Sequence, residues 1–158
     1  MGKLQIIDDG MLDDVSAQAR AAPRLRRNRN IHASEQEPCN RLLNALEPGT
    51  YFVPHLHEDS TKDETMVMLR GSVGLLVFDR DGNVVEKAIL DAAGGNRAVT
   101  IPHGVWHSIV VLEPGTILFE TKAGPYRPFK PHELAPWAPK EGTPEAPAYL
   151  AKLRQEFA

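Results

Sequence analysis

The hydrophobic and polar positions of the chain divide it into three stretches. Residues 1–38 contain a predicted helix over 9–22, which Asp9 can cap and a proline ends, followed by an arginine-rich connector. Residues 39–124 consist of short runs of β-branched and aromatic residues at even spacing, separated by Gly, Pro and Asp turn signals. Residues 125–158 are rich in proline. We therefore expect one domain with a β-rich centre.

The central stretch predicts seven or eight short strands with no helices between them. This pattern favours an antiparallel sandwich or barrel, so the predicted fold class is all-β. The clearest hairpin is "FDRDGNV" (78–84), whose Asp-Gly-Asn turn joins two apolar runs. The run "RLLNALE" (41–47) is ambiguous, because its leucines also suit one helical face. We interpret the proline-rich tail as a strap over the barrel, ending in a helix over 144–157 that docks on the barrel or on a partner subunit.

Composition and charge narrow the class of protein. The chain has 158 residues, of which 42% are hydrophobic and 25% charged, as in ordinary soluble domains. A formal net charge of -3 and the lack of an apolar run of ~20 residues argue against nucleic-acid and membrane partners. The basic group Arg24, Arg26, Arg27 and Arg29 is interpreted as a solvated connector. The single cysteine, Cys39, fits a reducing compartment, so a cytoplasmic location is expected.

Two histidines in "PHLH" (54–57) indicate a metal site. Because side chains alternate along a strand, His55 and His57 are expected to point the same way. Glu64 begins the next predicted strand and His107 lies on a distant one, so a barrel can bring all four together. Histidines with one carboxylate suit one divalent transition metal ion, zinc or iron first and manganese or nickel as further options.

Three segments carry a resemblance to the cupin superfamily. "GTYFVPHLH" (49–57) and "ETMVMLRG" (64–71) resemble the two halves of the first cupin motif, and "PHGVWH" (102–107) resembles the centre of the second. The resemblance implies a double-stranded β-helix, or jelly roll, with the four metal ligands named above. The spacer "EDSTKD" is longer than in most cupins, so Glu58 or Asp59 is an alternative to Glu64 as the acidic ligand.

The chain also looks like the WbuC-family cupin fold metalloproteins. Segments from "NRNIH" (28–32) to "FKPHELAPWAPKEG" (129–142) carry this resemblance over nearly the whole length. Genes of that family are associated with bacterial O-antigen clusters, which implies a role in lipopolysaccharide biosynthesis. We also expect a homodimer.

Three functions are compatible with such a site. The first is a metalloenzyme that isomerises or epimerises a sugar or nucleotide sugar, with Glu120 and Lys122 facing the barrel mouth; alternatively, both lie on the solvent face of an edge strand. The second is a non-haem iron dioxygenase, and the third is a metal-dependent binding protein without turnover. The candidate residues are Glu120, Lys122 and Tyr126 for catalysis and Arg41, Tyr51, Val53 and Met66 for binding a small-molecule ligand.

Overall fold

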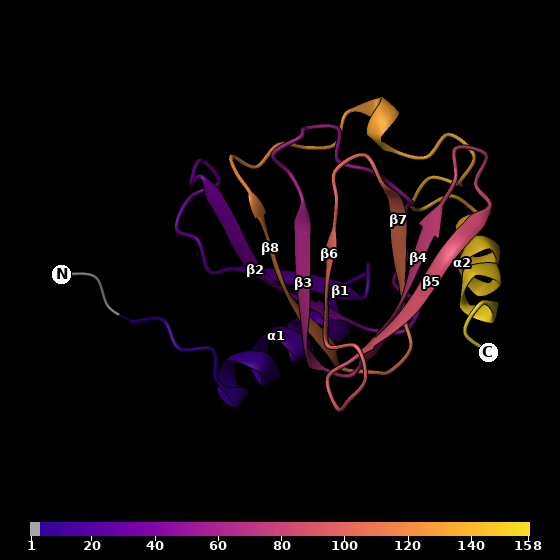
Figure 1. Ribbon diagram of the computed structural model, residues 1–158. Helices are drawn as coiled ribbons and strands as arrows, with labels where there is room; N and C mark the ends of the chain where they lie inside the picture. The colour runs from indigo at the N-terminus through magenta and orange to yellow at the C-terminus, as the bar shows by residue number, and fades with distance from the viewer. Residues whose placement is uncertain (1–3) are drawn as a thin grey trace.

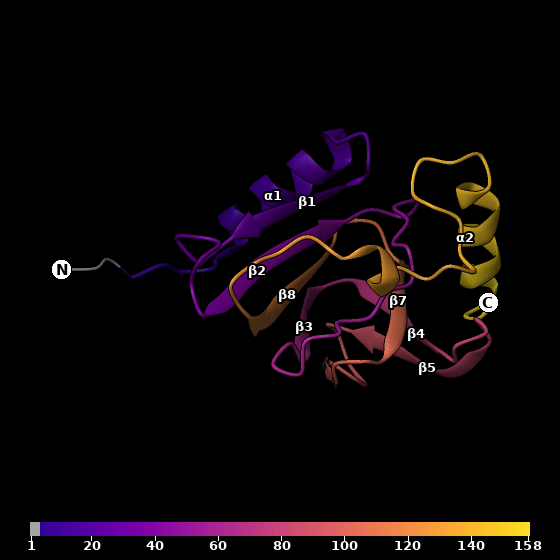
Figure 2. The same cartoon turned by 90° about the horizontal axis from the view of Figure 1, so that it is seen from above.

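Two antiparallel sheets face each other and form the body of the protein (Figures 1 and 2). The computed structural model describes residues 4–158. One sheet has the strand order β1-β2-β8-β3-β6 and the other has the order β5-β4-β7. The strands are β1 (Arg26–Asn30), β2 (Cys39–Leu46), β3 (Glu64–Arg70), β4 (Ser72–Phe78), β5 (Val84–Asp91), β6 (Ala98–Ile101), β7 (Trp106–Val111) and β8 (Thr116–Ala123). The predicted all-β class is therefore confirmed.

The main hydrophobic core lies between the two sheets. Met66 and Met68 alternate with half-buried residues along β3 and meet Leu75 of β4 and Ile109 of β7. Each of these four side chains is at most 7% exposed. Burial of such side chains contributes roughly 1.5–3 kcal/mol each to the free energy of unfolding, which holds the two sheets together.

Strand β2 is buried on both of its faces, which explains its ambiguous sequence. Leu46 points into the core between the sheets, whereas Leu43 and Ala45 pack against α1 (Asp9–Ala21) on the outer face. A strand buried on both faces reads as a continuous apolar run, so its period does not distinguish it from a helix. Pairing with β1 and β8 shows that it is a strand.

Two predictions for the N-terminal segment are corrected: the residue that caps the first helix and the structure of the arginine-rich connector. The side chain of Asp8, rather than that of Asp9, caps α1 by accepting a hydrogen bond of 2.9 Å from the Met11 amide. The arginine-rich connector contains a strand, β1, which pairs antiparallel with β2 and forms one edge of the larger sheet. Arginines on an exposed edge strand discourage pairing with other chains.

The proline-rich tail crosses one end of the barrel and contains the short helix η1 (Pro131–Glu133), as Figure 1 shows. The terminal helix α2 (Ala146–Gln155) then packs Leu150 and Leu153 against the outer face of the smaller sheet. The predicted docking of this helix on the barrel is therefore confirmed. Within residues 4–158, no helix is long and apolar enough to cross a membrane.

A glycine in β4 allows the chain end to pack closely. A Cβ atom built on Gly74 would lie 2.4 Å from the Phe157 ring, so Gly74→Ala forces this aromatic side chain away from the sheet. We expect a loss of about 1–3 kcal/mol in the free energy of unfolding, measured by urea denaturation. Gly94→Ala is the matched control, because nothing lies within 4 Å of that position. Equal stability of the two variants would contradict the prediction.

Candidate metal centre

Four side chains that are far apart in the sequence meet at the barrel end that the strap crosses. His55, His57, Glu64 and His107 each offer one ligand atom, and these atoms all lie within 4.8 Å of one another. Glu64 is the first residue of β3, and His107 is the second residue of β7. His57, Glu64 and His107 are at most 7% exposed. The structure thus brings together all four predicted ligands.

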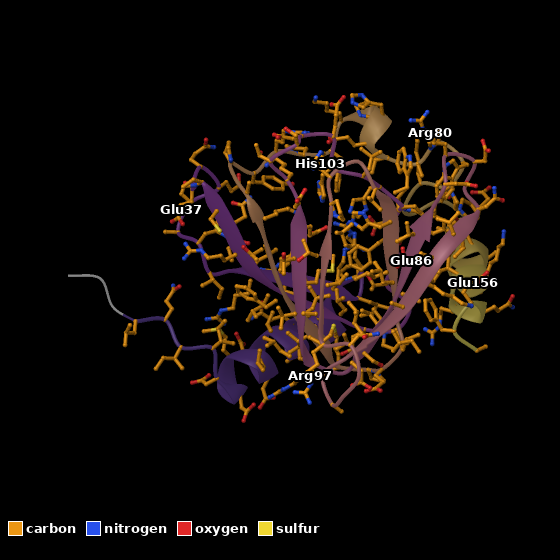
Figure 3. The ribbon with its side chains drawn as sticks, viewed as in Figure 1. Glu37, Arg80, Glu86, Arg97, His103 and Glu156 are labelled. Carbon is orange, nitrogen blue, oxygen red and sulfur yellow. The ribbon has the colours of Figure 1, made fainter. Side chains whose placement is uncertain are left out.

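The backbone places the histidines opposite each other. The His55 amide donates to the His107 carbonyl at 3.0 Å, and the His107 amide donates back at 2.9 Å. The His57 carbonyl accepts from the Gly104 amide at 2.8 Å. Figure 3 shows the neighbouring His103 at the strap end of the barrel, whereas Arg97 lies at the opposite end. The centre therefore lies near one mouth of the barrel.

The protonation of the rings fits a bound cation. The Nδ1 atoms of His55 and His107 lie 3.0 and 2.9 Å from the carbonyl oxygens of Val53 and Val105, and because carbonyls only accept, each Nδ1 carries the proton. The His107 Nε2 atom, on the other side of the ring, faces Glu64 Oε2 at 3.2 Å. An imidazole nitrogen and a carboxylate oxygen are both metal ligands, so the donor set fits a metal ion.

Burial and neighbouring charge prepare the ligands for a metal. Burial, and then the nearby His107, lower the pKa of His55 to about 3, so the ring is neutral at neutral pH. Burial alone raises the pKa of Glu64, but Lys122 and the hydrogen bonds with His107 and His57 together hold it well below its ordinary value. A neutral imidazole and an ionised carboxylate are the forms that bind metal.

The structure distinguishes between the acidic residues that the sequence left open. Glu58 pairs with Lys130 at 2.8 Å, and its side chain is 53% exposed. Asp59 accepts hydrogen bonds from Thr61 at 3.0 and 2.8 Å. Neither residue belongs to the metal-binding group, whereas Glu64 does.

A carboxyl group and an ammonium group stand beside the centre on β8. Lys122 lies directly opposite Glu64 in the sheet, and its Nζ donates to Glu120 Oε1 at 2.6 Å and to Glu64 Oε1 at 3.3 Å. Asn44 of β2 donates to the second Glu120 oxygen at 2.5 Å. Strand β8 lies between β2 and β3, so these residues do not form the solvent face of an edge strand. The alternative interpretation of Glu120 and Lys122 was therefore wrong.

The two charged groups on β8 have shifted pKa values. Burial, and then the charge of Glu64, raise the pKa of Glu120 to about 7. Burial alone lowers the pKa of Lys122, but the carboxylates of Glu120 and Glu64 outweigh it and raise the pKa. Glu120 can therefore exist in either protonation state near neutral pH, which suits a group that moves protons.

A cavity of about 980 Å³ extends from the centre into the barrel. Met66, Glu120 and Lys122 line it, and Tyr126, which is 49% exposed, lies at its rim. Arg41 does not line it and instead pairs with Glu37 at 2.6 Å. The structure therefore brings some of the predicted substrate residues to the cavity and leaves Arg41 outside it.

Tyr51 and Val53 also lie outside this cavity. Both belong to the cluster under α2, where Tyr51 donates to the Pro139 carbonyl at 2.8 Å. The sequence places them on the His55 face only if residues 51–57 form a strand, but this segment is irregular and contains Pro54. Phe52 lines the cavity instead. An alternation with a period of two requires an extended strand, so it does not apply to residues 51–54.

An aromatic residue of the strap completes the centre and had no signal in the sequence. The Phe129 ring lies 4.6 Å from the His55 ring and 5.4 Å from the His57 ring, with which it is stacked. Phe129 is 41% exposed and lines the cavity. It therefore covers two of the metal ligands from the solvent side.

Glu133 ties the strap to the segment that carries the histidines. It is fully buried, accepts two hydrogen bonds from Arg127 at 2.7 and 3.0 Å, and accepts from the Glu58 and Lys130 amides at 3.0 and 2.8 Å. The bond with Arg127 holds the pKa of Glu133 well below its ordinary value, although burial opposes this shift. The carboxylate therefore stabilises the folded protein when it is ionised.

Glu133→Gln is expected to lower the free energy of unfolding by roughly 2–4 kcal/mol at neutral pH, because Arg127 and two amides lose a charged acceptor. A depressed pKa gives stability that is complete above the unfolded-state pKa of about 4.3 and that decreases as the pH falls below it. Urea denaturation across this range should show that the wild-type advantage shrinks in acid. An unchanged advantage between pH 7 and pH 3 would contradict this role.

Solved structures share the fold. KdgF from Halomonas sp. matches 65% of this chain and 80% of its own, with 20% identity and a TM-score of 0.50. The conserved SPY1581 protein of unknown function from Streptococcus pyogenes matches 80% of this chain and 93% of its own, with 11% identity and a TM-score of 0.52. A variant of Bacillus subtilis oxalate decarboxylase matches 68% of this chain, with 21% identity and a TM-score of 0.50; this chain spans only 27% of that protein. Such likeness shows the fold alone.

The two-sheet barrel has a cupin-like jelly-roll fold, and its three-histidine, one-glutamate group is a candidate metal centre. Within that class the chain belongs to the family described as "Domain of unknown function (DUF6016)", whose model matches residues 7–90, just over half of the chain. This match includes His55, His57 and Glu64 but ends before His107. No curated protein matches the chain.

Proposed function

We propose that the protein is a metalloenzyme that isomerises or epimerises a sugar or nucleotide sugar. One observation carries the proposal: a carboxyl group, Glu120, and an ammonium group, Lys122, stand beside the metal ligands inside one large cavity. A centre used only for structure does not need a second buried carboxyl group, whose desolvation is costly.

Different residues of the chain have different roles in such a reaction. A metal ion held by His55, His57, Glu64 and His107 would supply a Lewis acid for a substrate carbonyl. In isomerisation, Glu120 takes the proton from the hydroxyl-bearing carbon beside that carbonyl and returns it to the carbonyl carbon, while the hydroxyl proton passes to the carbonyl oxygen. In epimerisation, the proton returns to the other face of the same carbon, so that no atom is gained or lost. Lys122 bonds to Glu64 and Glu120 and holds both carboxyl groups in position. Phe129 shields the reacting end from water.

The proposal also covers the pathway, the metal, the cellular location and the oligomeric state. The resemblance of the sequence to WbuC-family cupins supports a place in O-antigen or other surface-polysaccharide synthesis. Zinc or iron is the proposed metal, because three imidazoles and one carboxylate suit both ions, and manganese or nickel are further options. We further propose a cytoplasmic homodimer.

A second function, a non-haem iron dioxygenase, is supported by a different observation. Apolar side chains of Phe52, Met66, Ile109 and Leu118 line the cavity beside the ligand set. An apolar wall next to open coordination positions suits oxygen chemistry on a less polar substrate. The third alternative, a binding protein without turnover, predicts neither oxygen use nor proton exchange.

Two measurements separate the three functions. Elemental analysis of protein purified without added metal identifies the ion. Incubation in deuterium oxide with fructose 6-phosphate and with a 4-keto nucleotide sugar then shows, by NMR, whether a carbon-bound proton exchanges. Exchange without oxygen consumption supports the isomerase, iron with oxygen uptake supports the dioxygenase, and neither result supports the binding protein.

A further inference from the structure

A buried lysine lies in the loop between the two histidines and Glu64. Lys62 is 5% exposed, although the sequence "EDSTKD" (58–63) reads as a solvated loop. Its Nζ donates to the carbonyl oxygens of Ala123 and Pro125, both at 2.9 Å. An ammonium group has three N–H donors, so these two bonds leave one donor unused.

Lys62 lines a second, smaller cavity at the metal centre. This cavity measures about 60 Å³, several times the roughly 10–15 Å³ that one water molecule needs. His57 forms part of its wall, and Asn40, Lys122, Tyr126 and Phe129 line both this cavity and the large one. A ligand in the large cavity can therefore extend one small group into the side cavity.

The side cavity has an excess of positive charge. Of its other cations, Arg127 is paired with Glu133 and Lys122 is shared between Glu64 and Glu120. Within residues 4–158, Lys62 forms no ion pair with any carboxylate. Asp59 and Glu133 act on the Lys62 charge without a direct ion pair. A buried ammonium without a directly bound counter-ion is costly, which leaves a place for an anion.

Asn40 adds a polar group with no partner. It is 3% exposed, it lies directly opposite Lys122 in the β2–β8 pairing, and its Oδ1 is buried without a hydrogen-bond partner in the described part of the chain. An asparagine amide can donate to a carboxylate through its nitrogen and accept from a hydroxyl through its oxygen. The unpartnered atom is the amide oxygen, which fits a hydroxyl of a ligand, and the amide nitrogen is then the atom that can donate to a carboxylate.

We propose that this side cavity binds the carboxylate of a hydroxy acid, with Lys62 as the counter-ion and Asn40 as the neutral partner. The proposal deepens the proposed function and rests on it in one respect: the rest of the ligand, of sugar size, occupies the large cavity. The substrate class is then acidic sugars rather than neutral ones. Charge-assisted hydrogen bonds in a desolvated site make the carboxylate the group that decides affinity.

A purely structural role is the competing explanation of Lys62. Its two bonds connect the loop to the segment after β8, and this alone could account for its burial. In that case replacement of Lys62 lowers stability but does not change which ligands bind. Asn40→Asp separates the two explanations, because it leaves both Lys62 bonds in place and replaces the neutral partner of the ligand carboxylate by a carboxylate of the same size that repels it.

The test compares D-glucuronate with D-glucose, which differ only in the carboxylate. Binding to the full-length, zinc-loaded protein is measured by saturation-transfer NMR and by calorimetry. We expect glucuronate to bind at least about tenfold more tightly, and we expect Lys62→Met and Asn40→Asp each to abolish this preference while zinc content is retained. Lys152→Met, an exposed lysine on α2, is the matched control and should keep the preference.

Each outcome decides the proposal. No difference between glucuronate and glucose, whether both bind or neither does, overturns it, and so does a preference that survives in both variants. If Lys62→Met does not fold, the Asn40→Asp result decides alone. The proposed function fails separately: glucuronate preference without deuterium exchange rejects the isomerase but keeps the carboxylate site, and exchange without the preference does the reverse.

Discussion

Replacement of His107 by alanine is expected to remove most of the bound metal from the folded protein. His107 is 1% exposed, and its Nε2 lies 3.2 Å from Glu64 Oε2, so alanine leaves one coordination position empty inside the barrel. Loss of a supporting residue around a metal ligand already costs 10–100-fold in affinity, and loss of a ligand itself should cost more. Elemental analysis after dialysis should find far less than one metal ion per chain. His57→Ala should have the same effect.

A histidine outside the centre provides the control for this experiment. The His132 side chain is 60% exposed and bonds to Glu58, so His132→Ala should keep its metal. Circular dichroism must show that all variants are folded. Full metal occupancy in folded His57→Ala and His107→Ala proteins would show that the ligand assignment is wrong.

Glu120→Gln is expected to lower the rate of deuterium exchange into substrate by roughly 10²–10⁴-fold. Glutamine has the same size and can still accept from Lys122, but it cannot take up a proton. Metal content should not change, because Glu120 is not among the four residues of the metal-binding group. The readout is the exchange rate by NMR at equal metal occupancy, so a loss of metal cannot be mistaken for a loss of proton transfer.

Glu156→Gln, at an exposed site on the opposite side of the smaller sheet from the core, is the matched control and should exchange at the wild-type rate. Lys122→Met has a different expected result. Because Lys122 bonds to both carboxyl groups, its removal should weaken metal binding and exchange together. Wild-type exchange in Glu120→Gln would exclude Glu120 as the proton-transfer group.

The fold could be predicted where the hydrophobic residues of a segment repeat with the period of a helix or of a strand. The hairpin turns and the terminal helix carry such signals, and the core positions of β3 alternate as expected. The strand β2 could not be told from a helix, because α1 covers one of its faces and the second sheet covers the other. Strand β1 was missed because its arginines resemble a solvated connector, and only its pairing with β2 makes it a strand.

The metal centre was predictable because its ligands lie in two local motifs at fixed spacing. The surrounding cavity was not, because its walls depend on contacts between distant segments. Pro54 and the irregular backbone around it moved Tyr51 and Val53 to another cluster and brought Phe52 into the cavity. Lys62 and Phe129 come from a loop and a strap, where side-chain direction follows no period.

The position of the centre between the two sheets has a consequence for stability. Glu64 belongs to the five-stranded sheet and His107 to the three-stranded sheet, and the two residues are 43 positions apart in the chain. A metal ion bound to both is a cross-link between the sheets in a protein whose single cysteine cannot form an internal disulfide. A ligand that binds only the folded state raises the midpoint of unfolding with its concentration. Chelation would therefore remove a clamp that joins the two halves of the barrel at this end.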